Sequence, residues 1–63
     1  MAEIMDLQGQ FNAAILLWEA EDVLRWIHNQ QGNSVDEQVN LDRMKLLGIV
    51  AHDLQRQIGA KLA

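Results

Sequence analysis

Residues 11–27, FNAAILLWEAEDVLRWI, predict the middle and end of a long helix that is apolar on two sides. With a step of about 100° per residue, one side of this helix carries a first stripe, made of Ile4, Leu7, Phe11, Ala14, Ile15 and Trp18. The opposite side carries a second stripe, made of Ala13, Leu16, Leu17, Ala20, Val23, Leu24 and Ile27. A helix that is apolar all round is normally buried on all sides. One neighbouring helix therefore cannot cover both stripes.

The sequence after this stretch predicts a tight turn and one further helix. Gly32 follows the last apolar residue of the first helix and suits the left-handed conformation that ends many helices. Ser34 lies three residues before Glu37, which is a capping-box pattern at the start of a helix. We therefore expect an all-α fold, a helix-turn-helix hairpin of two long antiparallel helices over about 3–31 and 35–62.

The second helix has an apolar seam for packing against the first. Its residues recur at intervals of three and four, as in coiled coils, and are Met44, Leu47, Ala51, Leu54 and Ile58. Folding about Gly32 brings Trp18 close to Leu47. Leu41 and Ile49 lie outside the seam, so they are either exposed or contact a third element.

The length of the chain favours self-association. Its 63 residues form a single domain, 1–63, and contain no cysteine, so disulfides cannot stabilise it. A chain of this size buries only about 60% of the surface that its unfolded form exposes. We expect two hairpins to dimerise into a four-helix bundle, through Leu7, Phe11, Ile15 and Trp18.

The net charge of −4 lies on the first helix. That helix has five carboxylates and one guanidinium, whereas the second has four charges of each sign. We expect helical ion pairs between Glu21 and Arg25, Asp42 and Lys45, and Asp53 and Arg56. An acidic surface repels phosphate backbones and anionic lipid and favours a basic protein patch.

Two further features bear on localisation. The longest uninterrupted apolar run, residues 13–18, has six residues, far short of the ~20 that a membrane helix needs. The N-terminus, MAEIMD, carries acid where a secretory signal needs base. We expect a cytoplasmic protein that does not enter a membrane.

No combination of side chains predicts catalysis. In the hairpin, His28 and His52 lie about 20 Å or more apart, so they cannot share a metal, and both are expected at the surface. The carboxylates of Glu19, Glu21 and Asp22 point in different directions around the helix, which indicates a solvated face. We expect no catalytic residue, no metal, no cofactor and no enzymatic activity.

Trp26 is the strongest candidate for a partner contact. It falls between the two stripes and is expected to be half exposed, and tryptophan is enriched at the centres of protein interfaces. The full set of candidate partner-binding residues is Trp26, Glu19, Asp22, Leu41, Ile49, His52 and Arg56. The sequence thus favours a small homodimeric interaction module, of the kind found among bacterial and phage regulators, that binds and modulates another protein.

The alternative is a nucleic-acid-binding regulator. In length and expected topology alone, the chain resembles the plasmid repressor-of-primer proteins, whose dimeric helical hairpins bind paired RNA loops. That resemblance implies an RNA or DNA site, for which a dimer would display Arg43, Lys45 and Arg56 in duplicate. Nucleic-acid binding also predicts a basic stripe on one face, whereas here neighbouring acids balance the basic residues, so nucleic acid is the less favoured partner.

Overall fold

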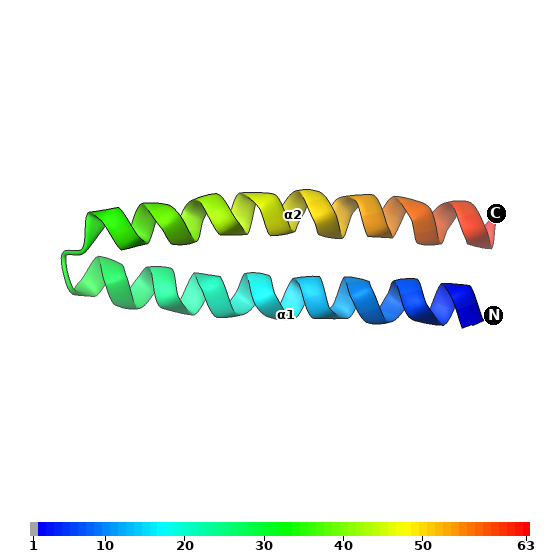
Figure 1. Cartoon of the computed structure of the whole chain (residues 1–63), viewed down its shortest axis with the longest axis horizontal. Helices are drawn as coiled ribbons and strands as arrows, with labels where there is room; N and C mark the ends of the chain where they lie inside the picture. The colour runs from blue at the N-terminus through cyan, green and yellow to red at the C-terminus, as the bar shows by residue number, and fades with distance from the viewer. Residues whose placement is uncertain (1) are drawn as a thin grey trace.

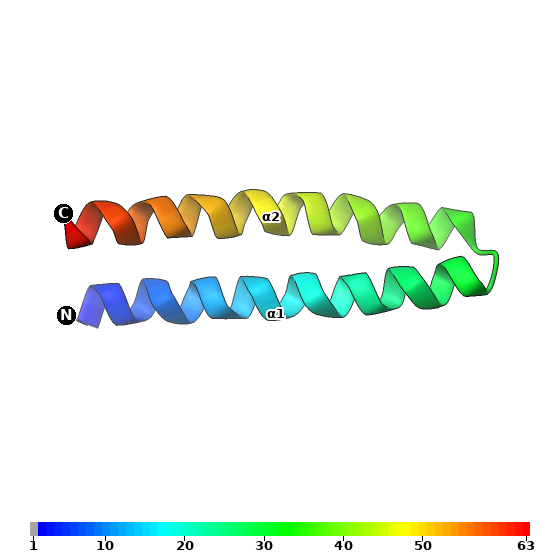
Figure 2. The same ribbon diagram turned by 180° about the vertical axis from the view of Figure 1, so that it is seen from behind.

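The computed structural model describes residues 2–63 and consists of two antiparallel helices, α1 (Ala2–Gln30) and α2 (Ser34–Leu62), joined by a short turn. The helices lie side by side in both opposite views, with the two termini at the same end (Figures 1 and 2). The molecule is a rod of 46 × 14 × 10 Å. The predicted all-α hairpin is confirmed. Within residues 2–63, no helix has the length and apolar character that crossing a membrane needs.

The turn ends α1 as predicted. Gly32 has φ of 70°, the left-handed conformation that a residue without Cβ adopts most easily. The Gly32 N–H donates to the Asn29 carbonyl at 3.1 Å, and the Asn33 N–H donates to the His28 carbonyl at 2.9 Å. These two bonds form a Schellman motif, which satisfies carbonyls that the helix end would leave unpaired.

The predicted cap of α2 is wrong by one residue. Asn33, and not Ser34, is the N-cap, and its Oδ1 accepts the Asp36 N–H at 3.1 Å. The expected capping partner, Glu37, instead accepts a hydrogen bond from Asn29 across the turn at 2.8 Å. Because Gly32 already ends α1, the residue directly after it lies outside both helices and takes the capping position.

The seam between the helices follows the predicted three-and-four spacing. Ala14 on α1 and Ala51 and Leu54 on α2 are its most buried apolar residues, each 6% exposed. Trp18 and Leu47 line the same groove, which confirms the expected register.

The first stripe of α1 is the one that packs against α2. Leu7 and Phe11 are half-buried, while Ile15 and Trp18 lie at the edge of the seam, 36% and 37% exposed. Residues that the sequence assigned to self-association are therefore engaged within one chain. The second stripe is left uncovered, with Leu16 and Leu17 at 66% and 57% exposure.

Near the turn the seam becomes polar. Asn40, only 2% exposed, donates from Nδ2 to Glu21 at 2.7 Å, and its Oδ1 accepts from His28 Nδ1 at 2.6 Å. Arg43 forms an ion pair with Glu21 at 3.5 Å. We call Glu21, His28, Asn40 and Arg43 the polar cluster.

The contacts in and beside the polar cluster correct three expectations. His28 is half-buried and not a surface residue, and the Glu21 side chain, 17% exposed, lies against α2 and not on a solvated face. Arg25 pairs with Asp22 at 3.1 Å and not with Glu21. The reason is that the three-and-four spacing of the α1 seam continues past Trp18 onto residues 21, 25 and 28, so these side chains face α2 although they are polar.

Candidate interaction groove

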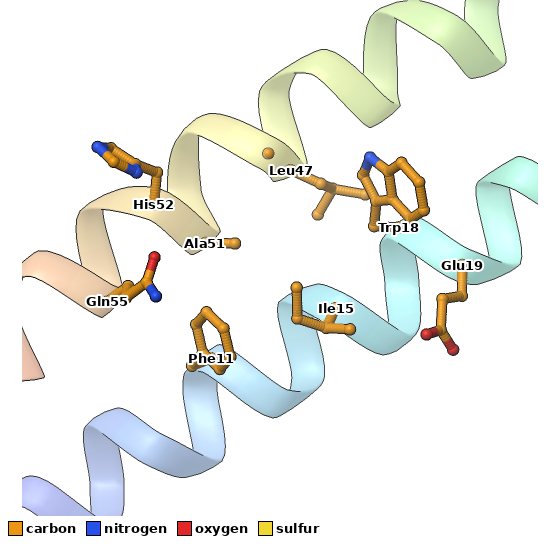
Figure 3. Close-up of a pocket in the computed structure, with 9 residues that line it drawn as sticks. Phe11, Ile15, Trp18, Glu19, Leu47, Ala51, His52 and Gln55 are labelled. Atoms are coloured by element: carbon orange, nitrogen blue, oxygen red, sulfur yellow. The ribbon is translucent and has the colours of Figure 1, made fainter.

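A groove of about 410 Å³ opens along one edge of the seam (Figure 3). We call it the seam groove, and its apolar walls are Phe11, Ile15 and Trp18 from α1 and Leu47, Gly48 and Ala51 from α2. In Figure 3, Phe11 and Ile15 extend from α1 into the space below Ala51, and Trp18 lies beside Leu47. The groove is therefore walled by both helices.

Gly48 explains why the groove is open. A Cβ built on Gly48 would meet no atom within 4 Å, so this position in α2 faces empty space. Its neighbour in the seam, Ala51, is also small. Two small residues one helical turn apart leave unfilled the space that larger side chains would occupy.

The rim of the groove is polar. Glu19, His52 and Gln55 also line it, and in Figure 3 Glu19 and His52 point away from the space between the helices. An apolar floor with a polar rim is the usual arrangement of a protein-binding patch.

The same side of the hairpin carries most of the predicted partner-binding residues. On α1, positions 15, 19, 22 and 26 recur at helical spacing, and on α2 positions 41, 45, 48, 52 and 55 do the same. We call this surface the groove face. It brings together five of the candidates, which are Glu19, Asp22, Trp26, Leu41 and His52. Trp26 is 59% exposed and Leu41 40% exposed, so the groove face also presents apolar side chains near the turn, beyond the charged positions 19, 22 and 45.

The other two candidates lie apart from this face. Ile49 is 62% exposed and, with Arg56, falls on the outer side of α2, away from α1. Arg56 donates to Asp53 at 2.7 Å, which confirms the predicted pair. That hydrogen bond, with a second from Gln57, lowers the pKa of the Asp53 carboxyl below its ordinary value.

The basic residues are mostly engaged with carboxylates. Four of the five lie within 4.0 Å of an acidic side chain, namely Arg25, Arg43, Arg56 and Lys61. A phosphate backbone would have to compete with these pairs, so the arrangement weighs against the nucleic-acid alternative.

The partner-binding residues predicted from the sequence include Glu19 and His52 from the rim of the groove but none of its apolar walls. The sequence did not indicate Gly48 as an opening, and Phe11, Ile15 and Trp18 were predicted to serve self-association. The available signal was a glycine beside the seam, within an otherwise regular helix.

No protein-family model matches the chain, and no curated protein or solved structure is significantly similar to it.

Proposed function

We propose that the protein is a small non-enzymatic interaction module that binds an amphipathic helix of another protein in the seam groove. The observation that supports this most directly is the open apolar groove between the helices, with exposed Trp26 and Leu41 on the same face. Helix-in-groove recognition inserts apolar side chains at helical spacing into such a groove. Sequestering a helix in this way would modulate the protein that carries it.

The chemistry of the face specifies the partner helix. A large apolar side chain such as leucine or phenylalanine fits between Ile15 and Ala51, where Gly48 leaves space. Glu19, on the rim of the groove, favours lysine or arginine beside that anchor, because unlike charges across an interface raise the association rate. Asp22 lies on the same side but is already paired with Arg25 at 3.1 Å. The proposed ligand is therefore a helix with an apolar stripe and basic flanks.

The test uses helical peptides selected from a displayed library of amphipathic sequences, with affinity measured by calorimetry. Gly48→Leu should weaken binding at least tenfold, because the new side chain occupies the groove. Gly9→Leu is the matched control, since a Cβ at Gly9 also meets nothing within 4 Å and Gly9 lies outside the groove. Equal affinity of both variants, or a selection that returns no binder, would contradict the proposal.

We also propose that the module is a homodimer. The hairpin covers only one stripe of α1, and the second stripe exposes Leu17 and Val23 at 57% and 58%. Removing such aliphatic surface from water stabilises an assembly by about 25 cal/mol per Å².

A further inference from the structure

A largely aliphatic surface, interrupted on α2 by Arg43, lies on the side of the hairpin opposite the groove face. On α1 it follows a row of helically spaced residues, which are Ala13, Leu17, Ala20, Leu24 and Ile27. On α2 it follows the row Val39, Arg43, Leu46 and Val50. Leu17 and Leu46, with Leu47, Glu21 and Arg43, line one shallow hollow, so the two rows meet across the seam. We call this surface the aliphatic face.

The hairpin exposes more surface than a compact chain of the same mass. A compact folded chain of 7.2 kDa is expected to expose about 4,100 Å², whereas the hairpin exposes 4716 Å². The excess, about 600 Å² by that scaling, is close to the roughly 800 Å² that each partner contributes to a standard protein interface. One partner of similar size is enough to cover it.

We propose that the aliphatic face packs against the same face of a second copy, with both turns at the same end of the bundle. In this arrangement a two-fold axis runs parallel to the helices, and α1 of each chain lies against α2 of its partner. This inference rests on the proposed homodimer and defines the surface and the orientation that form it.

Charge favours this orientation over its alternative. A two-fold axis perpendicular to the helices would place the turns at opposite ends and set α1 against α1. Glu19 and Asp22 lie on the groove face, but α1 as a whole, with five carboxylates and one guanidinium, has a net charge of −4, so that arrangement would bring together two helices of like net charge. With the turns at the same end, each α1 instead lies beside α2, whose four acidic and four basic side chains balance. Like charges placed together across an interface are unfavourable.

The distribution of apolar residues along the rod agrees with this orientation. The α1 row occupies residues 13–27 and the α2 row residues 39–50, and the shared hollow places Leu17 beside Leu46. With both turns at one end, each apolar level meets an apolar level of the partner. The polar segments near Glu3 and Lys61, which pair at 2.8 Å, also meet each other and remain accessible to water.

The first test is the absolute mass by light scattering across a range of concentrations, comparing two variants of α2. Leu46 and Ile49 are equally exposed, 63% and 62%, but only Leu46 lies on the aliphatic face. Leu46→Glu should reduce the mass from twice the chain mass to the 7.2 kDa of one chain, whereas Ile49→Glu should leave a dimer. A monomeric wild type, a dimeric Leu46→Glu, or equal dissociation by both substitutions would overturn the proposal.

The second test measures orientation, using the absence of native cysteine. Spin labels on Ala63→Cys, at the open end of the hairpin, should lie within the width of the bundle, about 10 to 25 Å apart, because neighbouring helices are spaced 8–10 Å. Turns at opposite ends would separate these labels by more than about 40 Å, at 1.5 Å per residue. The long distance would overturn the orientation while leaving the homodimer in place.

The proteins of the first test also distinguish dimerisation through the aliphatic face from the proposed partner binding in the seam groove. Leu46→Glu leaves the seam groove unaltered, so the selected helical peptide should bind the monomeric variant with the wild-type affinity per chain. A monomeric wild type that binds the peptide would refute the dimer alone, and a dimer that binds none would refute the groove function alone.

Discussion

Asn40, at 2% exposure, is the most buried of residues 2–63, and it is polar. Its amide is satisfied by Glu21 and His28, so its burial costs little as long as both partners remain. Asn40→Ala would leave Glu21 and His28 without their hydrogen bonds to the amide, and we expect the free energy of unfolding to fall by about 1–3 kcal/mol. Urea unfolding at fixed protein concentration measures this loss. The exposed Gln38→Ala is the control, and an equal effect of both changes would contradict a structural role for Asn40.

Asp53 accepts hydrogen bonds from Arg56 and Gln57 on the next turn of α2. The hydrogen bond from Arg56 is the largest cause of its lowered pKa, followed by that from Gln57. Because the folded pKa lies below the ordinary value of 3.8, this carboxylate stabilises the folded state above that pH and loses its effect as the pH falls through the folded pKa. Carboxyl chemical shifts followed by NMR should show a higher Asp53 pKa in Arg56→Gln. An unchanged pKa would show that the pair does not persist in solution.

The polar cluster is the part of the seam that was not predicted from the sequence. Only apolar residues were used to trace the seam, so it was lost beyond Trp18 on α1 and before Met44 on α2. Extending the same spacing leads to Glu21 and His28 on one helix and to Asn40 on the other. Polar residues at the three-and-four spacing of the seam were therefore the signal that predicts the cluster. A polar residue in such a position fixes the register of packed helices.

At the scale of elements, the caps and the seam determine where each helix ends and how it packs. Gly32 was predicted correctly because the left-handed conformation strongly favours glycine. The N-cap was misplaced because Asn33 and Ser34 are both good caps, and the pattern of Ser34 with Glu37 favoured the wrong one.

The position of the α2 N-cap can be tested by comparing alanine substitutions at residues 33 and 34. Asn33→Ala removes the acceptor of the Asp36 N–H and should lower the free energy of unfolding by about 0.5–2 kcal/mol. Ser34→Ala changes the first residue of α2 and should have a much smaller effect. Thermal unfolding followed by circular dichroism distinguishes the two, and a larger loss for Ser34→Ala would contradict the observed capping geometry.

Truncating a buried residue of the seam should lower stability more than removing the N-cap of α2. Leu54 is 6% exposed, and Leu54→Ala should cost about 2–5 kcal/mol through lost burial and a residual cavity. Leu41, on the same helix and 40% exposed, provides the matched change, and Leu41→Ala should cost much less. Chemical denaturation measures both losses, and similar values would show that the register of the hairpin is wrong.

At the scale of the whole molecule, two helices share only one seam, so each of them keeps apolar residues that the other cannot reach. The double stripe of α1 predicted this surplus from the sequence. It did not predict which stripe would face α2, because both have helical spacing and similar apolar content. The choice depends on the pairing of Phe11, Ile15 and Trp18 with the seam of α2, which is a tertiary property.

If the aliphatic face is covered by a second copy, stability must depend on concentration. Folded dimers are favoured over unfolded monomers by mass action, and a tenfold rise in concentration contributes about 1.4 kcal/mol per dimer. With the usual unfolding entropy per residue, this corresponds to a rise in Tm of about 5 °C. Calorimetry over two decades of concentration should show this rise for the wild type and for Ile49→Glu. Leu46→Glu should melt at a lower temperature that does not change with concentration, because a monomer has no association equilibrium, and a concentration-independent Tm for all three proteins would mean that the hairpin folds alone.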